Sequence, residues 1–231
     1  VTGVQTCALP ISSITDDRER DGFHTAMPFR PRYDYSYDGI MRSHEHSLQR
    51  LGLARADILF VHDIGRVTHG EADARYREQL IAGGGFRALE SLRDQGAISG
   101  FGLGVNEVAV CIDAIRTAPI DVLLLANRYT LLEQTPLDAL FPLCEANGVS
   151  VIAGAPYNSG ILASGTRGSG TPWYDYGPAS EAIIARVRRI AGQVAAIERS
   201  VAADADCAAT LHLVAAVRGA VAGLMDELVE D

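Results

Sequence analysis

The sequence contains no lysine, and all twenty of its basic residues are arginine. Coding DNA that favours arginine codons is a sufficient cause of this bias. The consequence for function is nevertheless strict, because any mechanism that needs a lysine side chain is excluded for this chain.

Cysteine, long apolar runs and excess positive charge are also scarce. The four cysteines are widely spaced, with no CxxC pair and no zinc-ligand spacing, so we expect a reduced, cytoplasmic protein without a metal site. No window holds about 18 uninterrupted apolar residues, which predicts no membrane partner. The net charge of −9 makes a nucleic-acid backbone an unexpected partner. The sequence leaves the oligomeric state open.

The first twelve residues, VTGVQTCALPIS, differ from everything that follows. They lack the basic start of a secretory signal, and Pro10 interrupts their short apolar run. We interpret residues 1–12 as the translation of a sequencing adapter, an artefact to be set aside; an ordinary loose terminus is the alternative. On this interpretation residues 13–231 hold the protein itself, which we expect to be incomplete at its N-terminus.

Helix-like and strand-like segments alternate from Asp38 onward. Asp38 is suited to cap a helix whose apolar face includes Ile40, His44, Leu48 and Leu51, with Gly52 just beyond its end. Further helices are predicted at 86–95, 107–117, 135–147 and 178–198. Strands are predicted at 57–61, 98–103, 120–125 and 149–154.

The predicted strands are apolar throughout, which indicates a parallel sheet covered on both faces in an α/β fold. A doubly wound sheet and a (β/α)8 barrel are the two candidate architectures. No GxGxxG motif follows any strand, and GFGLGV has the wrong spacing, which argues against a dinucleotide-binding Rossmann domain. In a barrel, polar residues beyond the carboxyl ends of the strands line one common site. Such residues follow all four strands: His62-Asp63, Asn106, Asn127-Arg128 and Tyr157-Asn158-Ser159.

These strand ends carry a family resemblance. The segments SLQRLGLARADILFVHD and ALESLRDQGAISGFGLGVNE resemble the aldo-keto reductases. The segments LLLANRYTLLEQ and GAPYNSGILASG narrow the resemblance to the branch of D-threo-aldose (L-fucose) and pyridoxal dehydrogenases. The resemblance implies part of a (β/α)8 TIM barrel, with strands four to seven and their helices. A partial barrel would leave strand four, at 57–61, with an unpaired edge.

The resemblance also implies a reaction. Family members bind NADP or NAD in extended form and move a hydride between the nicotinamide and a substrate carbonyl, here C1 of an aldose or a pyridoxal-like aldehyde. A Tyr acid, a Lys, an Asp and a His assist the reaction, because charge develops on the carbonyl oxygen. His62 matches the family histidine, although a lone histidine is otherwise more often structural. The other three residues belong to strands one to three, so we expect this chain to be inactive.

Cofactor-binding positions also follow from the resemblance. Asn106 matches the family asparagine that holds the nicotinamide carboxamide, and a helix cap is its alternative role. Asn127 replaces a frequent family glutamine as a source of an amide. The run of Tyr157, Asn158 and Ser159 stands where a loop approaches the pyrophosphate, with an ordinary turn as the alternative.

Four residues outside the family pattern, and the C-terminal region, stay unassigned. Tyr33, Tyr35 and Tyr37 lie on the wrong loop for the family acid. His69, on the loop after His62, is more easily explained as a surface residue than as a substrate contact. From about Gly192 onward no family segment is recognisable, which leaves a frame-shifted reading or divergence as explanations. A non-catalytic nucleotide-binding regulatory protein, and a barrel enzyme that uses His62 in other chemistry, remain alternative functions.

Overall fold

The structure is a computed structural model that describes residues 2–4, 32–167, 170–203 and 206–222. The chain divides into two compact units. The first holds the residues up to Leu124 together with Leu143–Ile152, and the second holds Leu125–Pro142 together with the residues from Ala153 onward. Most of the segment 1–12 that we interpret as an artefact lies outside the described residues, with only 2–4 inside them.

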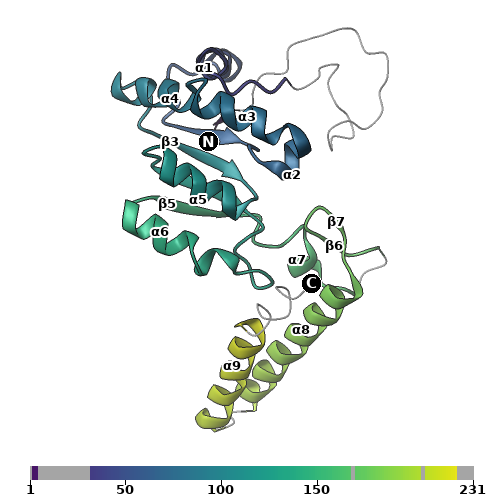
Figure 1. The fold of residues 1–231 in the computed structure, drawn as a ribbon. Helices are drawn as coiled ribbons and strands as arrows, with labels where there is room; N and C mark the ends of the chain where they lie inside the picture. Colours follow the sequence, from purple (N-terminus) through teal and green to yellow (C-terminus); the bar gives the residue numbers. More distant parts are fainter. Residues whose placement is uncertain (1, 5–31, 168–169, 204–205, 223–231) are drawn as a thin grey trace. The chain divides into compact units, whose positions relative to one another are not determined.

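A five-stranded sheet has the order β1-β2-β3-β4-β5 (Figure 1). Strand β2 pairs in parallel with β3, with His62 opposite Gly104. The four predicted strands are therefore present and adjacent in chain order, as an α/β fold requires. Their bounds are β2 (Ile58–His62), β3 (Gly100–Val105), β4 (Val122–Ala126) and β5 (Ser150–Gly154).

The expectation of an unpaired edge on β2 is wrong. Residues Thr2–Val4 form β1, which pairs in parallel with Leu59–Val61. The physical reason is general: a strand edge presents free N–H and C=O groups, and a short extended segment is sufficient to pair with them.

Three helices of the first unit were predicted from periodicity, after Asp38 and at 86–95 and 107–117, and the structure contains them with two corrections at the first helix, α1. The other helices of this unit were not predicted. Ser36 rather than Asp38 is its N-cap, because the Ser36 hydroxyl accepts the N–H of Gly39 at 3.2 Å. Leu51 is 47% exposed, so the apolar face ends one turn earlier than predicted. The helices are α1 (Tyr37–Leu51), α2 (Arg66–His69), α3 (Asp73–Ile81), α4 (Gly85–Asp94) and α5 (Val108–Thr117), with a 3-10 turn η1 (Gly70–Ala72).

The core of the first unit lies on the sheet. All six residues of β3 are buried, and the predicted stripe of α4 (Phe86, Leu89, Leu92) is buried as well. Gly102 of β3 packs closely against the main chain of β4, since a Cβ at Gly102 would lie 1.5 Å from the main-chain oxygen of Val122. This position therefore accommodates glycine alone.

The second unit begins at the end of β4 and is mostly helical. Its core consists of Leu132, Ile161, Ile183, Val187 and Ile190. The helix predicted at 135–147 is divided into a 3-10 turn and a later helix, α6. The elements are η2 (Thr135–Leu137), α6 (Leu140–Asn147), α7 (Ile161–Ser164), β6 (Trp173–Tyr174), β7 (Gly177–Pro178), α8 (Glu181–Ala202) and α9 (Cys207–Ala222), of which α6 straddles the two units.

Helices α8 and α9 run side by side as a hairpin (Figure 1). The hydroxyls of Ser200 and Thr210 lie 2.8 Å apart across it. Helix α8 continues four residues beyond the predicted end at 198, and α9 falls in the region that the sequence left unassigned. Over the described part of the chain, no helix combines the length and apolarity needed to cross a membrane.

Candidate functional site

His62 and Asn106 lie at the carboxyl ends of two neighbouring strands in the first unit. His62 is the last residue of β2, and Asn106 directly follows β3, the parallel neighbour of β2. The N–H of Asp63 extends the ladder by donating to the main-chain oxygen of Gly104 at 2.9 Å. The His62 side chain is 39% exposed, and its Nδ1 lies 3.2 Å from Oδ2 of Asp63. This geometry leaves the ring accessible while a carboxylate orients it.

A buried tyrosine, Tyr35, contacts the main chain of His62. Tyr35 is 1% exposed, and its hydroxyl donates to the main-chain oxygen of His62 at 2.9 Å. The same hydroxyl lies 2.8 Å from Nε2 of His69. Burial raises the pKa of the Tyr35 phenol well above its ordinary value. A phenol with a raised pKa releases its proton less readily, and the exclusion of Tyr35 as the family acid stays a prediction.

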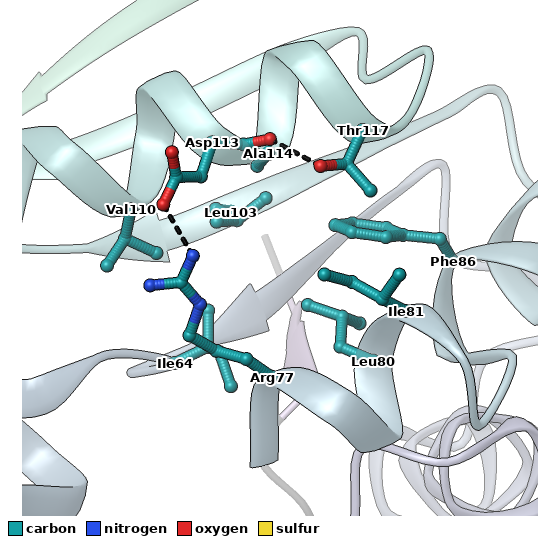
Figure 2. Close-up of a pocket in the computed structure, with 10 residues that line it drawn as sticks. All are labelled: Ile64, Arg77, Leu80, Ile81, Phe86, Leu103, Val110, Asp113, Ala114 and Thr117. Atoms are coloured by element: carbon teal, nitrogen blue, oxygen red, sulfur yellow. Dashed lines mark hydrogen bonds and ion pairs between the residues drawn. The ribbon is translucent and has the colours of Figure 1, made fainter. Parts of the chain in front are cut away.

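A pocket of the first unit lies away from the predicted residues. It is formed by side chains of α3, α4, α5, β3 and the loop after β2, and it contains the ion pair between Arg77 and Asp113 (Figure 2). None of the six residues predicted for catalysis or cofactor binding lines it. The lining residues are Ile64, Arg77, Leu80, Ile81, Phe86, Leu103, Val110, Asp113, Ala114 and Thr117.

Two asparagines meet in the second unit. Asn127 is 1% exposed and Asn158 is fully buried, and Nδ2 of Asn158 donates to the main-chain oxygen of Asn127 at 3.3 Å. Among the described residues, both amide atoms of Asn127 and Oδ1 of Asn158 have no hydrogen-bond partner. A buried polar atom without a partner costs about 1–3 kcal/mol, so this group is suited to a polar ligand.

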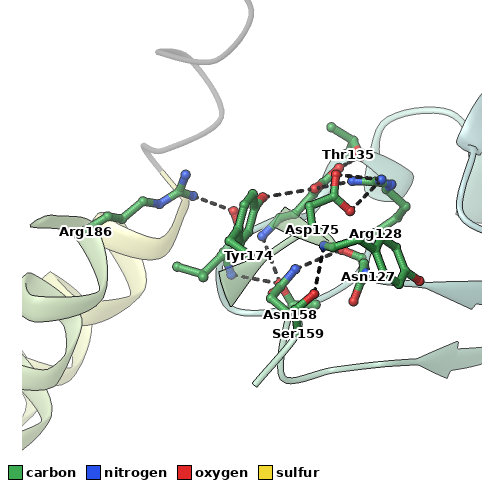
Figure 3. A network of polar contacts seen from close by, with 12 residues as sticks. Asn127, Arg128, Thr135, Asn158, Ser159, Tyr174, Asp175 and Arg186 are labelled. Carbon is green, nitrogen blue, oxygen red and sulfur yellow. Dashed lines mark hydrogen bonds and ion pairs between the residues drawn. The ribbon is translucent and has the colours of Figure 1, made fainter. Parts of the chain in front are cut away.

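An arginine-centred network adjoins the asparagines and was not predicted from the sequence (Figure 3). Arg128 donates to Oε2 of Glu133 at 3.0 Å and to both carboxylate oxygens of Asp175 at 2.9 and 3.0 Å. Burial lowers the pKa of Arg128 and the two carboxylates raise it, with a net rise. Arg128 was visible as a strand-end residue, but Asp175 lies 47 positions away and no local pattern links the two.

The loop after β5 is held in an uncommon backbone conformation. Asn158 and Ser159 have φ values of 46° and 58°, and Asp175 and Tyr176 in the β6–β7 turn have 46° and 67°. The Ser159 hydroxyl accepts the N–H of Tyr176 at 2.9 Å, which ties the loop to the turn. The Tyr157 side chain is 60% exposed. Positive φ at residues other than glycine is costly and tends to occur at functional sites.

The predicted residues thus form two groups. His62 and Asn106 belong to the first unit, and Asn127, Tyr157, Asn158 and Ser159 belong to the second. The convergence of all six on one site stays a prediction.

Comparison with known proteins identifies the family. The profile of the Aldo/keto reductase family matches residues 26–203. The chain belongs to the aldo/keto reductase family. It is 48% identical over 169 residues to a pyridoxal 4-dehydrogenase of Microbacterium luteolum and 34% identical over 176 residues to a D-threo-aldose 1-dehydrogenase of a Pseudomonas species. These matches confirm the branch that the sequence motifs indicated.

This aldo/keto reductase chain spans about half the length of those relatives. The matches cover 73% and 76% of the chain but 49% and 50% of the relatives. An aldo-keto reductase of Bacillus halodurans in its holo form has a similar fold, with a TM-score of 0.52 at 20% identity, covering 77% of this chain and 51% of that one. The structure therefore contains part of the barrel.

The C-terminal region has a second similarity. A profile described as a metal-sensitive transcriptional repressor matches residues 179–231, which overlap the first match at 179–203. The region thus resembles a known family, an explanation different from the frame shift or divergence considered on sequence grounds. Within the described residues, no cluster of three or more His, Cys, Asp or Glu side chains is placed to hold a metal ion.

Proposed function

We propose that the strand ends of this chain belong to an NAD(P)-dependent dehydrogenase that acts on an aldose or a pyridoxal-like aldehyde. Family membership supports the reaction type, and the two dehydrogenases named above support the substrate classes. Their names differ in substrate, so the proposal covers both classes.

The unpartnered amide of Asn127 is the observation that carries the proposal. A nicotinamide carboxamide offers one acceptor and two donor hydrogens, which complement the amide of Asn127 and Oδ1 of Asn158. When bound, the nicotinamide supplies or accepts the hydride. Asn106 is proposed as a further carboxamide ligand, and Tyr157 and Ser159 are proposed to contact the pyrophosphate. The residues present therefore fit this cofactor.

His62 is proposed to donate a hydrogen bond to the substrate carbonyl oxygen. Its ring is partly exposed at a strand end, with Asp63 beside Nδ1, which leaves Nε2 to face the substrate. The chain has no lysine to lower the pKa of a tyrosine acid. We therefore propose that the chain binds nucleotide but turns over substrate at least about 10²-fold more slowly than a version extended upstream with the family Tyr and Lys.

Titration calorimetry with NADPH and with NADH tests cofactor binding. Asn127→Gly keeps the positive φ of 62° while removing the amide, and it should weaken binding about tenfold. Asn147→Ala is the matched control, since Asn147 is exposed on α6 and its Nδ2 donates to the main-chain oxygen of Leu143 in the same helix at 2.8 Å. Absence of binding by the unchanged chain would contradict the proposal.

Turnover is tested separately with L-fucose and pyridoxal, beside the extended version. Equal rates for the two proteins would show that the required acid lies within this chain. Nucleotide binding without turnover even in the extended version would favour the regulatory alternative.

We propose a second function for the α8–α9 hairpin, the binding of a DNA duplex, because a transcriptional repressor is the class of protein that the second profile names. The profile match and the exposed Arg188 and Arg189 on α8 support it. The described residues do not fit a metal site, so no metal response is proposed.

Fluorescence anisotropy with a labelled DNA duplex tests the proposal: binding should weaken with salt and in the Arg188→Ala, Arg189→Ala double variant. Absence of DNA binding at low salt would contradict this second proposal and agree with the expectation, based on the net charge of −9, that nucleic acid is not a partner.

A further inference from the structure

The carbonyl of His62 faces away from β3. The N–H of Asp63 points to β3, where it donates to Gly104. Because successive residues of a strand direct their polar groups to opposite sides, the His62 carbonyl points to the side of β1. The described pairing with β1 reaches only Val61. Among the described residues, the hydroxyl of Tyr35 donates to this last carbonyl of β2 at 2.9 Å.

Three contacts fix the segment that carries Tyr35. Its N–H donates to Oε1 of Gln79 on α3 at 3.1 Å. Two residues later, the N–H of Tyr37 donates to the main-chain oxygen of Gly83 at 3.0 Å. The carbonyl of Tyr35 approaches Gly85 so closely that a Cβ there would lie 2.1 Å away. The hydroxyl that reaches His62 thus extends from an anchored segment.

The hydroxyl of Tyr35 has one proton for two neighbours. A phenol donates once and accepts through its lone pairs. If the proton were directed at Nε2 of His69, two oxygen atoms 2.9 Å apart would face each other without a proton between them. The arrangement that satisfies both contacts has Tyr35 donating to the His62 carbonyl and accepting Nε2–H from His69.

His69 has aromatic neighbours and a lowered pKa. The rings of Tyr33 and Tyr76 contact it, with centroids 4.6 and 4.3 Å away. Burial lowers the pKa of His69, although nearby carboxylates oppose the effect. Nε2 carries a hydrogen both in this neutral tautomer and in the protonated ring, so the contact does not depend on the charge of His69.

We propose that Tyr35 and His69 are positioning residues for His62. Together they hold the backbone from which the His62 ring projects, and Tyr35 fixes the tautomer of His69. This inference rests on the proposed function of His62 at the substrate carbonyl, but the contacts themselves are measurable without cofactor or turnover.

Long-range ¹H–¹⁵N spectra of the histidine-labelled chain test the inference at neutral pH. His69 should be the Nε2–H tautomer in the unchanged protein. Tyr35→Phe, which keeps the ring and removes the acceptor, should give a mixture of tautomers and shift the ring signals of His62. Tyr37→Phe is the matched control on the same segment and should leave both histidines unchanged.

Two substitutions of His69 separate positioning from packing. His69→Gln retains a donor for the Tyr35 hydroxyl and should preserve the His62 signals, whereas His69→Leu should shift them. An Nδ1–H tautomer in the unchanged chain would overturn the inference whether or not the variants fold, and so would His62 signals indifferent to Tyr35→Phe. Failure of the proposed function would appear as absent nucleotide binding and would leave these spectra as they are.

Discussion

Nδ2 of Asn158 donates to the main-chain oxygen of Asn127 over 3.3 Å, and both side chains are buried. The contact joins the end of β4 to the loop after β5 within the second unit. Both residues have positive φ, 62° and 46°, so each position combines a backbone cost with a polar side chain. Asparagine tolerates this conformation better than most residues do, which explains its use at both places.

Replacement of Asn158 should separate these two costs. Asn158→Ala loses the hydrogen bond and places a Cβ residue without a polar group at φ 46°. Asn158→Gly loses the same bond but is free of the backbone penalty. We expect the glycine variant to be more stable than the alanine variant by about 1 kcal/mol, measured by urea denaturation. Equal stabilities would show that the loop relaxes away from this backbone conformation.

The network around Arg128 should stabilise the second unit. Arg128 and Glu133 are each 16% exposed at their side chains, and Asp175 is 32% exposed. Arg128→Met leaves two carboxylates without their partner, so we expect a loss of about 2–3 kcal/mol in the free energy of unfolding. This value is below that for a fully buried pair because solvent screens Asp175.

Arg188→Met provides the control for that experiment. Arg188 is exposed on α8 and donates to the hydroxyl of Thr166 at 3.2 Å. The change should alter stability by less than about 0.5 kcal/mol. Similar losses in both variants would show that the network contributes no more than an exposed contact.

Two glycines should respond oppositely to alanine. Gly102→Ala places a Cβ 1.5 Å from a main-chain oxygen inside the sheet, so we expect a loss of more than about 3 kcal/mol or failure to fold. Gly192 is exposed in the middle of α8 with nothing within 4 Å of an added Cβ. Gly192→Ala should therefore stabilise the helix by about 0.5–1 kcal/mol. Circular dichroism during thermal unfolding measures both, and a destabilised Gly192→Ala would reveal a close contact at that face.

Thiol reactivity should follow burial. Burial raises the pKa of Cys111 to about 12, and Cys144 is also buried with a raised pKa, whereas Cys207 is exposed. Among these three cysteines, a maleimide at pH 8 should label Cys207 first, as measured by peptide mass spectrometry, with Cys207→Ser as the control. Rapid labelling of Cys111 in the folded chain would contradict its burial.

The raised pKa of Cys111 also predicts how the free energy of unfolding depends on pH. The folded pKa of Cys111 is about 12, above the ordinary thiol value of 9.0, so the unfolded chain loses this proton first as the pH rises. Stability should consequently fall between about pH 9 and 12, and Cys111→Ala should reduce that slope in urea denaturation. An unchanged slope would indicate that other groups dominate the alkaline transition.

Local pattern in the sequence was sufficient for α1, α4, α5, α8 and the strands β2 to β5, and for their order. The stripe of Phe86, Leu89 and Leu92 predicted α4, and four apolar runs predicted β2 to β5, because helical and strand periodicities are properties of neighbouring residues. The polar residues after each run predicted a site at the strand ends, and family motifs gave His62 its proposed role. The cap of α1 was misplaced by two residues, since both Ser36 and Asp38 are suitable caps and only backbone geometry selects between them.

Tertiary structure decided the contacts between distant residues. The bond from Tyr35 to His62 spans 27 positions and the pair of Arg128 with Asp175 spans 47, and no local spacing encodes either. The α8–α9 hairpin was likewise invisible as a unit, because helix periodicity shows which face is apolar but not which partner covers it. A hydrogen bond depends on the position and direction of two atoms, and the path of the backbone between them sets both only after the chain has folded.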